Sequence, residues 1–398
     1  MRGLYSLAIR SYTAAVKVAA MLGNAKAKLW VAGRKQRPAA GTDDAPWVWF
    51  HAASLGEFEQ GRPLIEALKK QYPDLKISLT FFSPSGYEIR KNYPLADEVL
   101  YLPVDTPKNA RQWVKRHRFV AAFFIKYEFW FNYMHALHEE GIPLYYISLI
   151  LKPNQYFFRW YGSWFRKQLK AVTHFFVQDD TTLALLQSIG FNNTTRCGDT
   201  RFDRVADIAR QARRFPEIED FIDGRKCIIA GSSWPPDEKL LIPYIERLPE
   251  DYCMIIAPHD ISEKHLQQIK KGLEHIDPKK VYLIDTVGIL SQLYQYARFV
   301  YIGGGFGVNI HNIQEPVTFG CPVVFGPKYK SFKEAVDLVR LGGAFSINNQ
   351  NELNQAFDRL INDEALCRQA SETCREYLKS QLGATETILG KITSTFSF

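Results

Sequence analysis

The sequence predicts an α/β protein with two doubly wound, Rossmann-like domains that face a shared cleft. Short apolar runs alternate with helix-length segments, which is typical of a parallel sheet with helices on both faces. A charged stretch around Pro216, residues 207–223, interrupts the alternation, which then starts again. With 398 residues, the chain is long enough for two or three domains with sizeable cores.

The expected strands fall into two groups, one in each domain. In the first domain, residues 46–206, the apolar runs are 47–53, 77–82, 99–104, 120–125, 144–151 and 175–177. In the second domain, residues 224–398, they are 227–231, 254–257, 281–284, 299–302 and 323–325. Residues from 351 onward are expected to form a helical tail on the second domain.

Residues 1–35 are expected to form an amphipathic helix that associates with a membrane. No uncharged run reaches the roughly 18 residues that a spanning helix needs. On one continuous helix, the basic side carries Arg10, Lys17, Lys28 and Lys35, and the apolar side carries Leu4, Leu7, Val18, Leu22 and Leu29. With Tyr5, Tyr12 and Trp30 as interface anchors, this pattern predicts a helix lying in the membrane surface. The alternative is a helix packed on the protein's own core. Residues 33–46 are expected to be a linker.

The chain is basic, with a net charge of +8 and a pI near 9.0. Such a balance favours an anionic partner: nucleic acid, an acidic membrane surface or a phosphorylated substrate. No arginine-rich tail or zinc-ligand spacing points to nucleic acid. The six cysteines include no C-x-x-C pair, which indicates a reducing cytoplasm and not a disulfide framework.

Glu57 follows the first expected strand, directly after Ser54 and Gly56. A carboxylate at the carboxyl end of a strand can reach into a cleft and accept a proton from an attacking hydroxyl. The alternative is a surface glutamate in the first turn of a helix, stabilised by the helix dipole.

Polar side chains also follow other strands of the first half. The second strand ends in a hydroxyl-rich turn, with Ser83, Ser85 and Gly86, that can line an acceptor or a phosphate. Glu128 follows the fourth strand; it is either a second cleft carboxylate or a structural acid paired with Lys126.

Arg201, in the segment Gly198-Asp-Thr-Arg-Phe-Asp203, follows a further expected strand. Its guanidinium can offset the charge of a leaving phosphate. The alternative is an ion pair with Asp199 or Asp203.

In the second half, the strand at 299–302 ends in three glycines, followed by His311, Asn312 and Glu315. Glycines at a strand end and a following helix N-terminus are typical of sites for anionic groups. Other strand ends here are also small or polar: Gly231-Ser-Ser233, Pro258-His259 and Thr286-Val287-Gly288. This coincidence predicts a nucleotide-sugar site. No G-x-G-x-x-G fingerprint and no D-x-D metal motif occurs, so a transfer without metal or cofactor is expected.

Several motifs, in this order, resemble those of the 3-deoxy-D-manno-octulosonic acid (Kdo) transferases of lipid A biosynthesis. They are His51-Ala-Ala-Ser-Leu-Gly-Glu57, Ser83-Pro-Ser-Gly86, Glu128-Phe-Trp-Phe-Asn132, Gly198-Asp-Thr-Arg-Phe-Asp203, Gly231-Ser-Ser233 and His311-Asn-Ile-Gln-Glu-Pro316. The resemblance extends from the N-terminal segment to at least Pro327.

The resemblance implies a glycosyltransferase B-type (GT-B) fold with two Rossmann-like domains and a membrane-associating N-terminal helix. It implies transfer of Kdo from CMP-Kdo, with inversion, to a tetraacylated lipid A precursor (lipid IVA) at the cytoplasmic face of the inner membrane. Glu57 matches the general base, and Glu128 and Arg201 match positions that support the transition state. The residues implied to contact CMP are Pro258, His259, Thr286, Val287, Gly288, Asn312, Ile313, Gln314 and Glu315. Ser54, Gly56, Ser83, Ser85 and Gly86 match acceptor or loop positions.

The chain departs from the family pattern at Lys126, Phe131 and Arg201, and its Ala257-Pro-His259 turn lacks the family's arginine. Two alternatives therefore accompany the Kdo transferase prediction. One is another sugar-nucleotide-dependent transferase with this fold. The other is a non-catalytic, membrane-bound protein that binds nucleotide or lipid.

Overall fold

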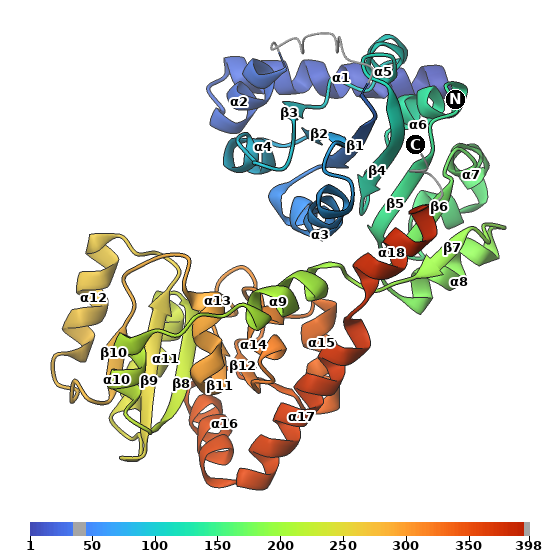
Figure 1. The fold of residues 1–398 in the computed structure, drawn as a ribbon. Helices are drawn as coiled ribbons and strands as arrows, with labels where there is room; N and C mark the ends of the chain where they lie inside the picture. The colour runs from blue at the N-terminus through green and yellow to red at the C-terminus, as the bar shows by residue number, and fades with distance from the viewer. Residues whose placement is uncertain (35–44, 394–398) are drawn as a thin grey trace. The chain divides into compact units, whose positions relative to one another are not determined.

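The computed structural model describes residues 1–34 and 45–393, which form two units, each organised around its own parallel sheet (Figure 1). The first unit contains Met1–Asp203 and the segment that starts at Leu382; the second is Arg204–Gln381. Helix α9 (Arg201–Arg210) crosses the boundary between them.

The sheet of the first unit has seven parallel strands in the order β3-β2-β1-β4-β5-β6-β7. The strands are β1 (Trp47–Ala52), β2 (Lys76–Phe81), β3 (Glu98–Tyr101), β4 (Phe119–Ile125), β5 (Leu144–Leu149), β6 (His174–Val177) and β7 (Thr194–Arg196). All six residues of β1 are buried, as expected for a parallel strand covered by helices on both faces. The order reverses direction between β1 and β4, which is the topological switch point where α/β sheets bind ligands.

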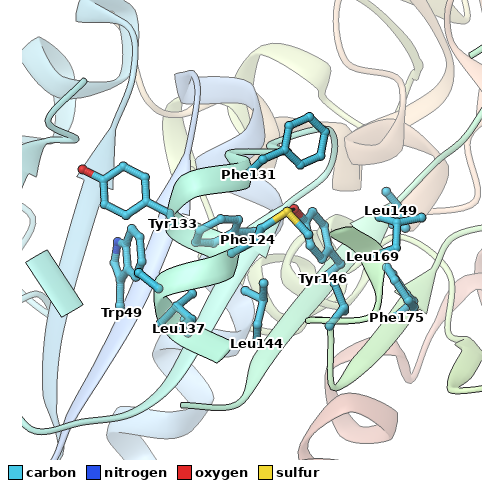
Figure 2. Close-up of a cluster of buried hydrophobic side chains, with 14 of the residues drawn as sticks. Trp49, Phe124, Phe131, Tyr133, Leu137, Leu144, Tyr146, Leu149, Leu169 and Phe175 are labelled. Atoms are coloured by element: carbon cyan, nitrogen blue, oxygen red, sulfur yellow. Dashed lines mark hydrogen bonds between the residues drawn. The ribbon is translucent and has the colours of Figure 1, made fainter. Parts of the chain in front are cut away.

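The core of this unit lies on both faces of the sheet. Because successive side chains of a strand point to opposite faces, Trp49 and Phe50 contribute to different clusters. Figure 2 shows the first of these, in which Trp49 and Phe124 pack with Tyr133 and Tyr146. The covering helices are α3 (Leu55–Gln71), α4 (Pro84–Arg90), α5 (Pro107–Val114), α6 (Phe131–Glu139), α7 (Ser163–Leu169) and α8 (Asp180–Ser188), with 3-10 turns at Tyr156–Phe158 and Trp160–Gly162.

The C-terminal helix α18 (Ala384–Ile392) packs on the first unit. Ile388 and Ile392 are fully buried in the cluster that contains Phe50. Asp203 holds the start of the helix, because its carboxylate accepts 2.7 Å hydrogen bonds from the backbone N–H groups of Gly383 and Thr385. The sequence prediction assigned all of 224–398 to the second domain. The apolar spacing shows that α18 has a buried face but not which core buries it.

The second unit repeats the same order, with six parallel strands arranged β10-β9-β8-β11-β12-β13. They are β8 (Lys226–Ser233), β9 (Tyr252–Pro258), β10 (Val281–Leu283), β11 (Ala297–Ile302), β12 (Val323–Phe325) and β13 (Ala344–Ser346). Sequence reasoning missed β13, a three-residue edge strand too short to form an apolar run. The helices are α10 (Pro216–Ile222), α11 (Pro235–Ile245), α12 (Glu263–Leu273), α13 (Leu290–Leu293), α14 (Gln314–Thr318), α15 (Lys333–Leu341), α16 (Gln350–Asn362) and α17 (Glu364–Gln381), with a 3-10 turn at Tyr294–Tyr296.

The N-terminal segment forms two helices, α1 (Arg2–Met21) and α2 (Ala25–Gly33), and not the continuous helix expected. Gly23 has a φ of 99°, which ends α1, and the Asn24 side chain caps α2 by accepting from the Ala27 N–H at 3.0 Å. Lys28 is therefore on a different helix from Arg10 and Lys17. Lys35 and most of the expected linker lie outside the described residues. Among residues 1–34 and 45–393, no helix is both long and apolar enough to cross a membrane.

One face of the two N-terminal helices packs on the first unit itself. The Tyr5 hydroxyl donates a 2.5 Å hydrogen bond to Asp105, and the Tyr5 ring contacts Phe131 with centroids 5.0 Å apart. Trp30 is only 6% exposed and packs edge-on against Phe82. Tyr5 and Trp30 are therefore core contacts and not the interface anchors that the sequence suggested. The other face exposes apolar side chains: Leu4, Leu7, Tyr12, Val18, Met21, Leu22 and Leu29.

Candidate active site

Each unit presents its candidate site residues at the switch point of its own sheet. In the first unit, Glu57 follows β1 and Glu128 follows β4, and these two strands are neighbours. In the second unit, Trp234 follows β8 and His311 follows β11, which are also neighbours. The sequence places polar residues at strand ends, and the topology brings these particular ends together.

Glu57 lies in the first turn of α3, one turn after the N-cap Ser54. Its Oε2 accepts a 2.5 Å hydrogen bond from the Ala53 N–H, so the carboxylate reaches back over the end of β1. Burial and, after it, the charge of Glu128 raise the pKa of the Glu57 carboxyl, which comes to about 7. The Ala53 N–H and the Lys126 charge act in the opposite direction. The result is a carboxyl group that changes its protonation state near neutral pH, as a general base requires.

Glu128 is held in place by His51 and Trp130. Its Oε2 lies 3.1 Å from His51 Nε2 and accepts a 2.7 Å hydrogen bond from Trp130 Nε1. His51 is fully buried in β1, and its Nδ1 lies 2.9 Å from the Thr80 hydroxyl of β2. Glu128 is thus an ordered, 9% exposed carboxylate beside Glu57. The sequence left open whether Glu128 is a second cleft carboxylate or an acid paired with Lys126. In the structure its side chain contacts His51 and Trp130.

The turn between β4 and Glu128 passes through Lys126, whose φ of 61° lies in the left-handed region. A non-glycine residue there costs free energy, and such strain tends to occur at functional sites. The Lys126 N–H donates to the Ile147 carbonyl at 3.0 Å, which continues the pairing with β5 before the chain turns. This turn directs Glu128 back toward the end of β1.

The predicted acceptor residues lie at the neighbouring ends of β1 and β2. The Ser83 N–H donates to the Ala53 carbonyl at 2.8 Å, and the Ser83 hydroxyl caps α4 by accepting from the Ser85 N–H at 3.2 Å. Gly86 is buried, and a Cβ there would come within 2.2 Å of Phe81. The absence of a side chain at Gly86 therefore lets α4 pack closely. Gly56 and Ser85 are exposed, and Ser54 is half-buried.

Arg201 forms the ion pair that the sequence offered as its alternative role. Its Nε and one terminal nitrogen contact the Asp199 carboxylate at 3.0 and 2.7 Å. Asp199 is buried, also accepts a 3.0 Å hydrogen bond from Gln60, and its pKa is lowered by the Arg201 charge against the opposing effect of burial. The Arg201 guanidinium is thus pre-oriented by a buried carboxylate, with part of its surface exposed.

In the second unit, Asp237 organises the glycine loop after β11. Its Oδ2 accepts 2.9 Å hydrogen bonds from the N–H groups of Gly304 and Trp234, and its Oδ1 accepts one from the Tyr301 hydroxyl at 2.8 Å. Gly304 has a φ of 90°, and a Cβ on Gly303 would lie 2.2 Å from the Ser232 carbonyl oxygen. The glycines are therefore needed for the chain to turn against the end of β8.

Three aromatic rings stack at this end of the second sheet. The His259 ring stacks on His311 with centroids 4.3 Å apart, and on Trp234 at 4.8 Å. The indole N–H of Trp234 donates a 2.9 Å hydrogen bond to His311 Nε2. Burial, followed by the charge of His259, lowers the pKa of His311 to about 4. His311 is therefore neutral at pH 7, with its remaining proton on Nδ1.

The other predicted nucleotide contacts divide into two groups. Asn312 precedes α14, where its Oδ1 accepts from the Gln314 N–H at 3.0 Å and its Nδ2 lies 3.3 Å from Glu315. Ile313 and Gln314, the first residue of α14, are buried, and so is Pro258 at the end of β9.

Thr286, Val287 and Gly288 form the second group and lie exposed in the loop after β10. In the sheet, β9 and β8 separate β10 from β11, so this loop belongs to a more distant strand end.

Sequence reasoning missed the supporting roles of His51, Trp234 and Asp237. His51 was part of a motif, but its partners come from β2 and from the loop after β4. Trp234-Pro-Pro-Asp237 carries a recognisable helix-start signal, with proline at the first helical position and an acid at the third. That signal predicts a cap but not the contacts with Gly304 and His311.

Comparison with known proteins identifies what this arrangement resembles. Residues 24–204 match the family described as 3-deoxy-D-manno-octulosonic-acid transferase (kdotransferase). A 3-deoxy-D-manno-octulosonic acid transferase from Aquifex aeolicus is 25% identical over 332 residues, which are 79% of this chain and 86% of the relative. One from Rickettsia felis is 24% identical over 333 residues, 77% of this chain and 69% of the relative. The predicted resemblance to the Kdo transferases is confirmed.

The similarity to Kdo transferases indicates a glycosyltransferase, and a solved structure agrees with the fold. The UDP-GlcNAc 2-epimerase from Neisseria meningitidis bound to UDP-GlcNAc aligns with a TM-score of 0.62 and 14% identity, over 88% of this chain and 99% of that one. At this identity the likeness concerns the fold alone. Together with the two Rossmann-like sheets, it confirms the predicted GT-B fold.

Proposed function

We propose that the protein is an inverting, metal-independent glycosyltransferase that moves Kdo from CMP-Kdo to a lipid A precursor. The observation that carries the proposal is Glu57, a carboxyl at the switch point of a Kdo transferase-like unit, whose pKa is raised to about 7. A general base works best when its pKa lies near the working pH, because it is then both ionised and basic enough.

In this mechanism Glu57 takes the proton of a glucosamine hydroxyl on the acceptor. The hydroxyl oxygen forms a bond with the anomeric carbon of Kdo from the face opposite the nucleotide. The bond between that carbon and the phosphate oxygen of CMP breaks, and CMP leaves with the electron pair. Because one displacement occurs, the configuration inverts. Glu128 is a positioning residue, since its charge raises the pKa of Glu57.

The departing CMP is an anion, and the second unit offers donors for it. The N-terminus of α14 follows the glycine loop, and the positive end of a helix suits an anionic group. His311, neutral with its proton on Nδ1, adds an uncharged hydrogen-bond donor beside Asn312. Arg201 supplies positive charge for the transition state, in the orientation that Asp199 sets.

The proposed acceptor is a lipid, and the proposed location is the cytoplasmic face of the inner membrane. Apolar side chains exposed along α1 and α2 support this, because a soluble protein seldom exposes so many on two neighbouring helices. Lys17, Lys26 and Lys28 lie on the same helices and would favour an anionic surface.

Nucleotide protection and one carboxamide substitution test the proposal. CMP should raise the melting temperature of the protein more than UDP does at equal concentration; a larger effect of UDP would favour a transferase that uses UDP-linked donors. Glu57→Gln should reduce the turnover rate by about 10²- to 10⁴-fold while CMP protection persists. Glu66→Gln, on the same helix, is the matched control and should leave turnover unchanged. Turnover of Glu57→Gln within tenfold of the parent would remove Glu57 as the base.

The non-catalytic alternative makes a different prediction. A protein that only binds nucleotide would show CMP protection without Kdo transfer in the parent as well as in Glu57→Gln. The raised pKa of Glu57 argues against it, because a purely structural cap is stabilised by ionisation and not by its suppression.

A further inference from the structure

A pocket of about 500 Å³ in the first unit is lined by residues of α1 and α5. Figure 1 shows these two helices next to each other. Three arginines line the pocket: Arg2 and Arg10 from α1, and Arg111 from α5. All seven lining residues belong to α1 or α5, and none of them carries a carboxylate. The pocket is therefore basic, and its lining includes neither Glu57 nor His311.

Two of the three charges that line this pocket are unpaired within the described part of the chain. Neither Arg10 nor Arg111 has a hydrogen-bond or ion-pair partner among residues 1–34 and 45–393. The Nε of Arg2 donates a 3.1 Å hydrogen bond to Asn132 Oδ1, and the Arg2 charge also interacts with the buried Asp105. Three like charges around one hollow repel one another, and an anion bound there would remove the repulsion. A guanidinium donates two parallel hydrogen bonds, which suits a phosphate.

The pocket has space for a phosphate group beside Gly3, one of its lining residues. A Cβ built on Gly3 would meet no atom within 4 Å, so the space above this glycine is open. Ser6 is buried beside it, and its hydroxyl accepts a 3.3 Å hydrogen bond from Asn132. The first turn of α1 contains no acidic residue, so its backbone N–H groups add positive potential at the same place.

Exposed apolar side chains adjoin the pocket. Leu4 is 64% exposed and Leu7, which lines the pocket, is 59% exposed. A free phosphate ester would gain nothing from these leucines, whereas a lipid would place its headgroup on the arginines and its acyl chains on the leucines. We infer that the pocket between α1 and α5 binds the phosphate monoester headgroup of an anionic membrane lipid. This inference does not depend on Kdo transfer, because it concerns binding alone.

Vesicle sedimentation with the full chain tests the lipid class. Phosphatidylcholine vesicles carry either phosphatidic acid, a phosphate monoester, or phosphatidylglycerol, a diester, at equal surface charge. The pocket should give about tenfold tighter binding to the phosphatidic acid vesicles. Equal affinity for the two would mean a diffuse charge effect and would overturn the inference. Soluble glycerol 3-phosphate that binds as tightly as the vesicles would assign the pocket to a free phosphate ester, and would also overturn it.

Charge-conserving substitutions distinguish a specific arginine site from attraction by the net positive charge of the protein. Arg10→Lys with Arg111→Lys keeps the net charge but loses the paired donors, and should abolish the preference for phosphatidic acid. The matched control is Lys17→Arg with Lys108→Arg, on the same two helices but outside the pocket lining, and should leave it intact. Loss of the preference in both pairs, or in neither, contradicts the site.

Gly3→Leu should change vesicle binding in opposite directions under two explanations. One is binding through the apolar surface of α1 alone, and the other is a pocket that holds a phosphate. A Cβ at position 3 meets no atom within 4 Å, so a leucine there would take up part of the pocket and add apolar area to α1. If α1 binds membranes only through its apolar surface, this variant should bind all vesicles more tightly. If the pocket holds a phosphate, binding to phosphatidic acid vesicles should weaken while binding to phosphatidylglycerol vesicles does not. Circular dichroism and the melting temperature confirm folding, and the lysine pair decides the question if Gly3→Leu does not fold.

Discussion

The indole N–H of Trp234 donates a 2.9 Å hydrogen bond to Nε2 of His311. An indole nitrogen can only donate, so Nε2 must accept, and the proton of the neutral imidazole sits on Nδ1. Protonation of Nε2 would set two N–H groups against each other in a partly buried place, which agrees with the lowered pKa of about 4. Trp234 thus fixes the tautomer of His311, while burial and the charge of His259 keep the ring neutral.

Trp234→Phe should keep the ring stack with His259 and lose the N–H. We expect the pKa of His311 to rise by about one unit or more toward its usual value, because the conflict of two N–H groups is gone. Nitrogen-15 NMR of labelled histidine measures both the tautomer and the pKa, with the exposed Trp160→Phe as the control. A proton on Nε2 in the parent protein would contradict the assigned tautomer.

The raised pKa of Glu57 makes the stability of the first unit depend on pH. The folded pKa, about 7, lies above the ordinary 4.5, so the unfolded chain releases this proton first. The contribution to stability is complete below pH 4.5 and is lost as the pH rises through 7. Glu57→Gln has no proton to lose, and should therefore gain about 1–3 kcal/mol of unfolding free energy relative to the parent between pH 5 and pH 8. Urea unfolding at the two pH values measures this; a constant difference between the two proteins would refute the raised pKa.

Glu128 should set where on the pH scale Glu57 ionises. In the parent, kcat/KM is expected to rise with pH through about 7 as Glu57 loses its proton. Glu128→Gln removes a neighbouring negative charge, so the rising part of the profile should shift to lower pH, whatever its height. The pH profile of kcat/KM with saturating acceptor gives the answer. A profile that stays in place would show that the two carboxyls do not interact.

Tyr5 ties α1 to the first unit through a buried carboxylate. Besides Tyr5, Asp105 accepts hydrogen bonds from the N–H groups of Asn132 and Tyr133, so it also caps α6. Tyr5→Phe should cost about 2 kcal/mol of unfolding free energy, because a hydrogen bond to a buried carboxylate is lost. Tyr12→Phe removes a hydroxyl from a side chain that is 49% exposed and should cost less than about 0.5 kcal/mol. Equal costs in urea unfolding would mean that the Tyr5 hydroxyl does not anchor the helix.

The local pattern of apolar and polar residues along the chain was enough to predict most of the architecture. Apolar runs bounded by small or polar residues gave the positions of the strands, and their alternation with helices gave two parallel sheets. The polar strand ends were visible for the same reason, since the chain must turn there. Glu57, for example, stands out because it directly follows a buried run and a glycine.

Contacts between distant segments could not be predicted in this way. Nothing near His51 in sequence indicates Thr80 or Glu128, and nothing near Ile388 indicates Phe50. The helical wheel for residues 1–35 was wrong because it assumed one helix, whereas Gly23 and Asn24 end α1 and start α2. The sequence alone does not distinguish Tyr5 and Trp30 from membrane anchors, because aromatic residues are common at interfaces and in cores. Burial, which separates the two, depends on the rest of the fold.

The most direct test of the proposed function is an assay that forms CMP-Kdo in the reaction mixture, with a lipid A precursor as acceptor and mass spectrometry of the lipid product. We expect the lipid to gain the mass of one or more Kdo residues with the parent protein, and this gain to be strongly reduced with Glu57→Gln. The number of residues added follows from the same spectrum. A lipid of unchanged mass, in a reaction where CMP still protects the protein from heat, would contradict Kdo transfer to this acceptor.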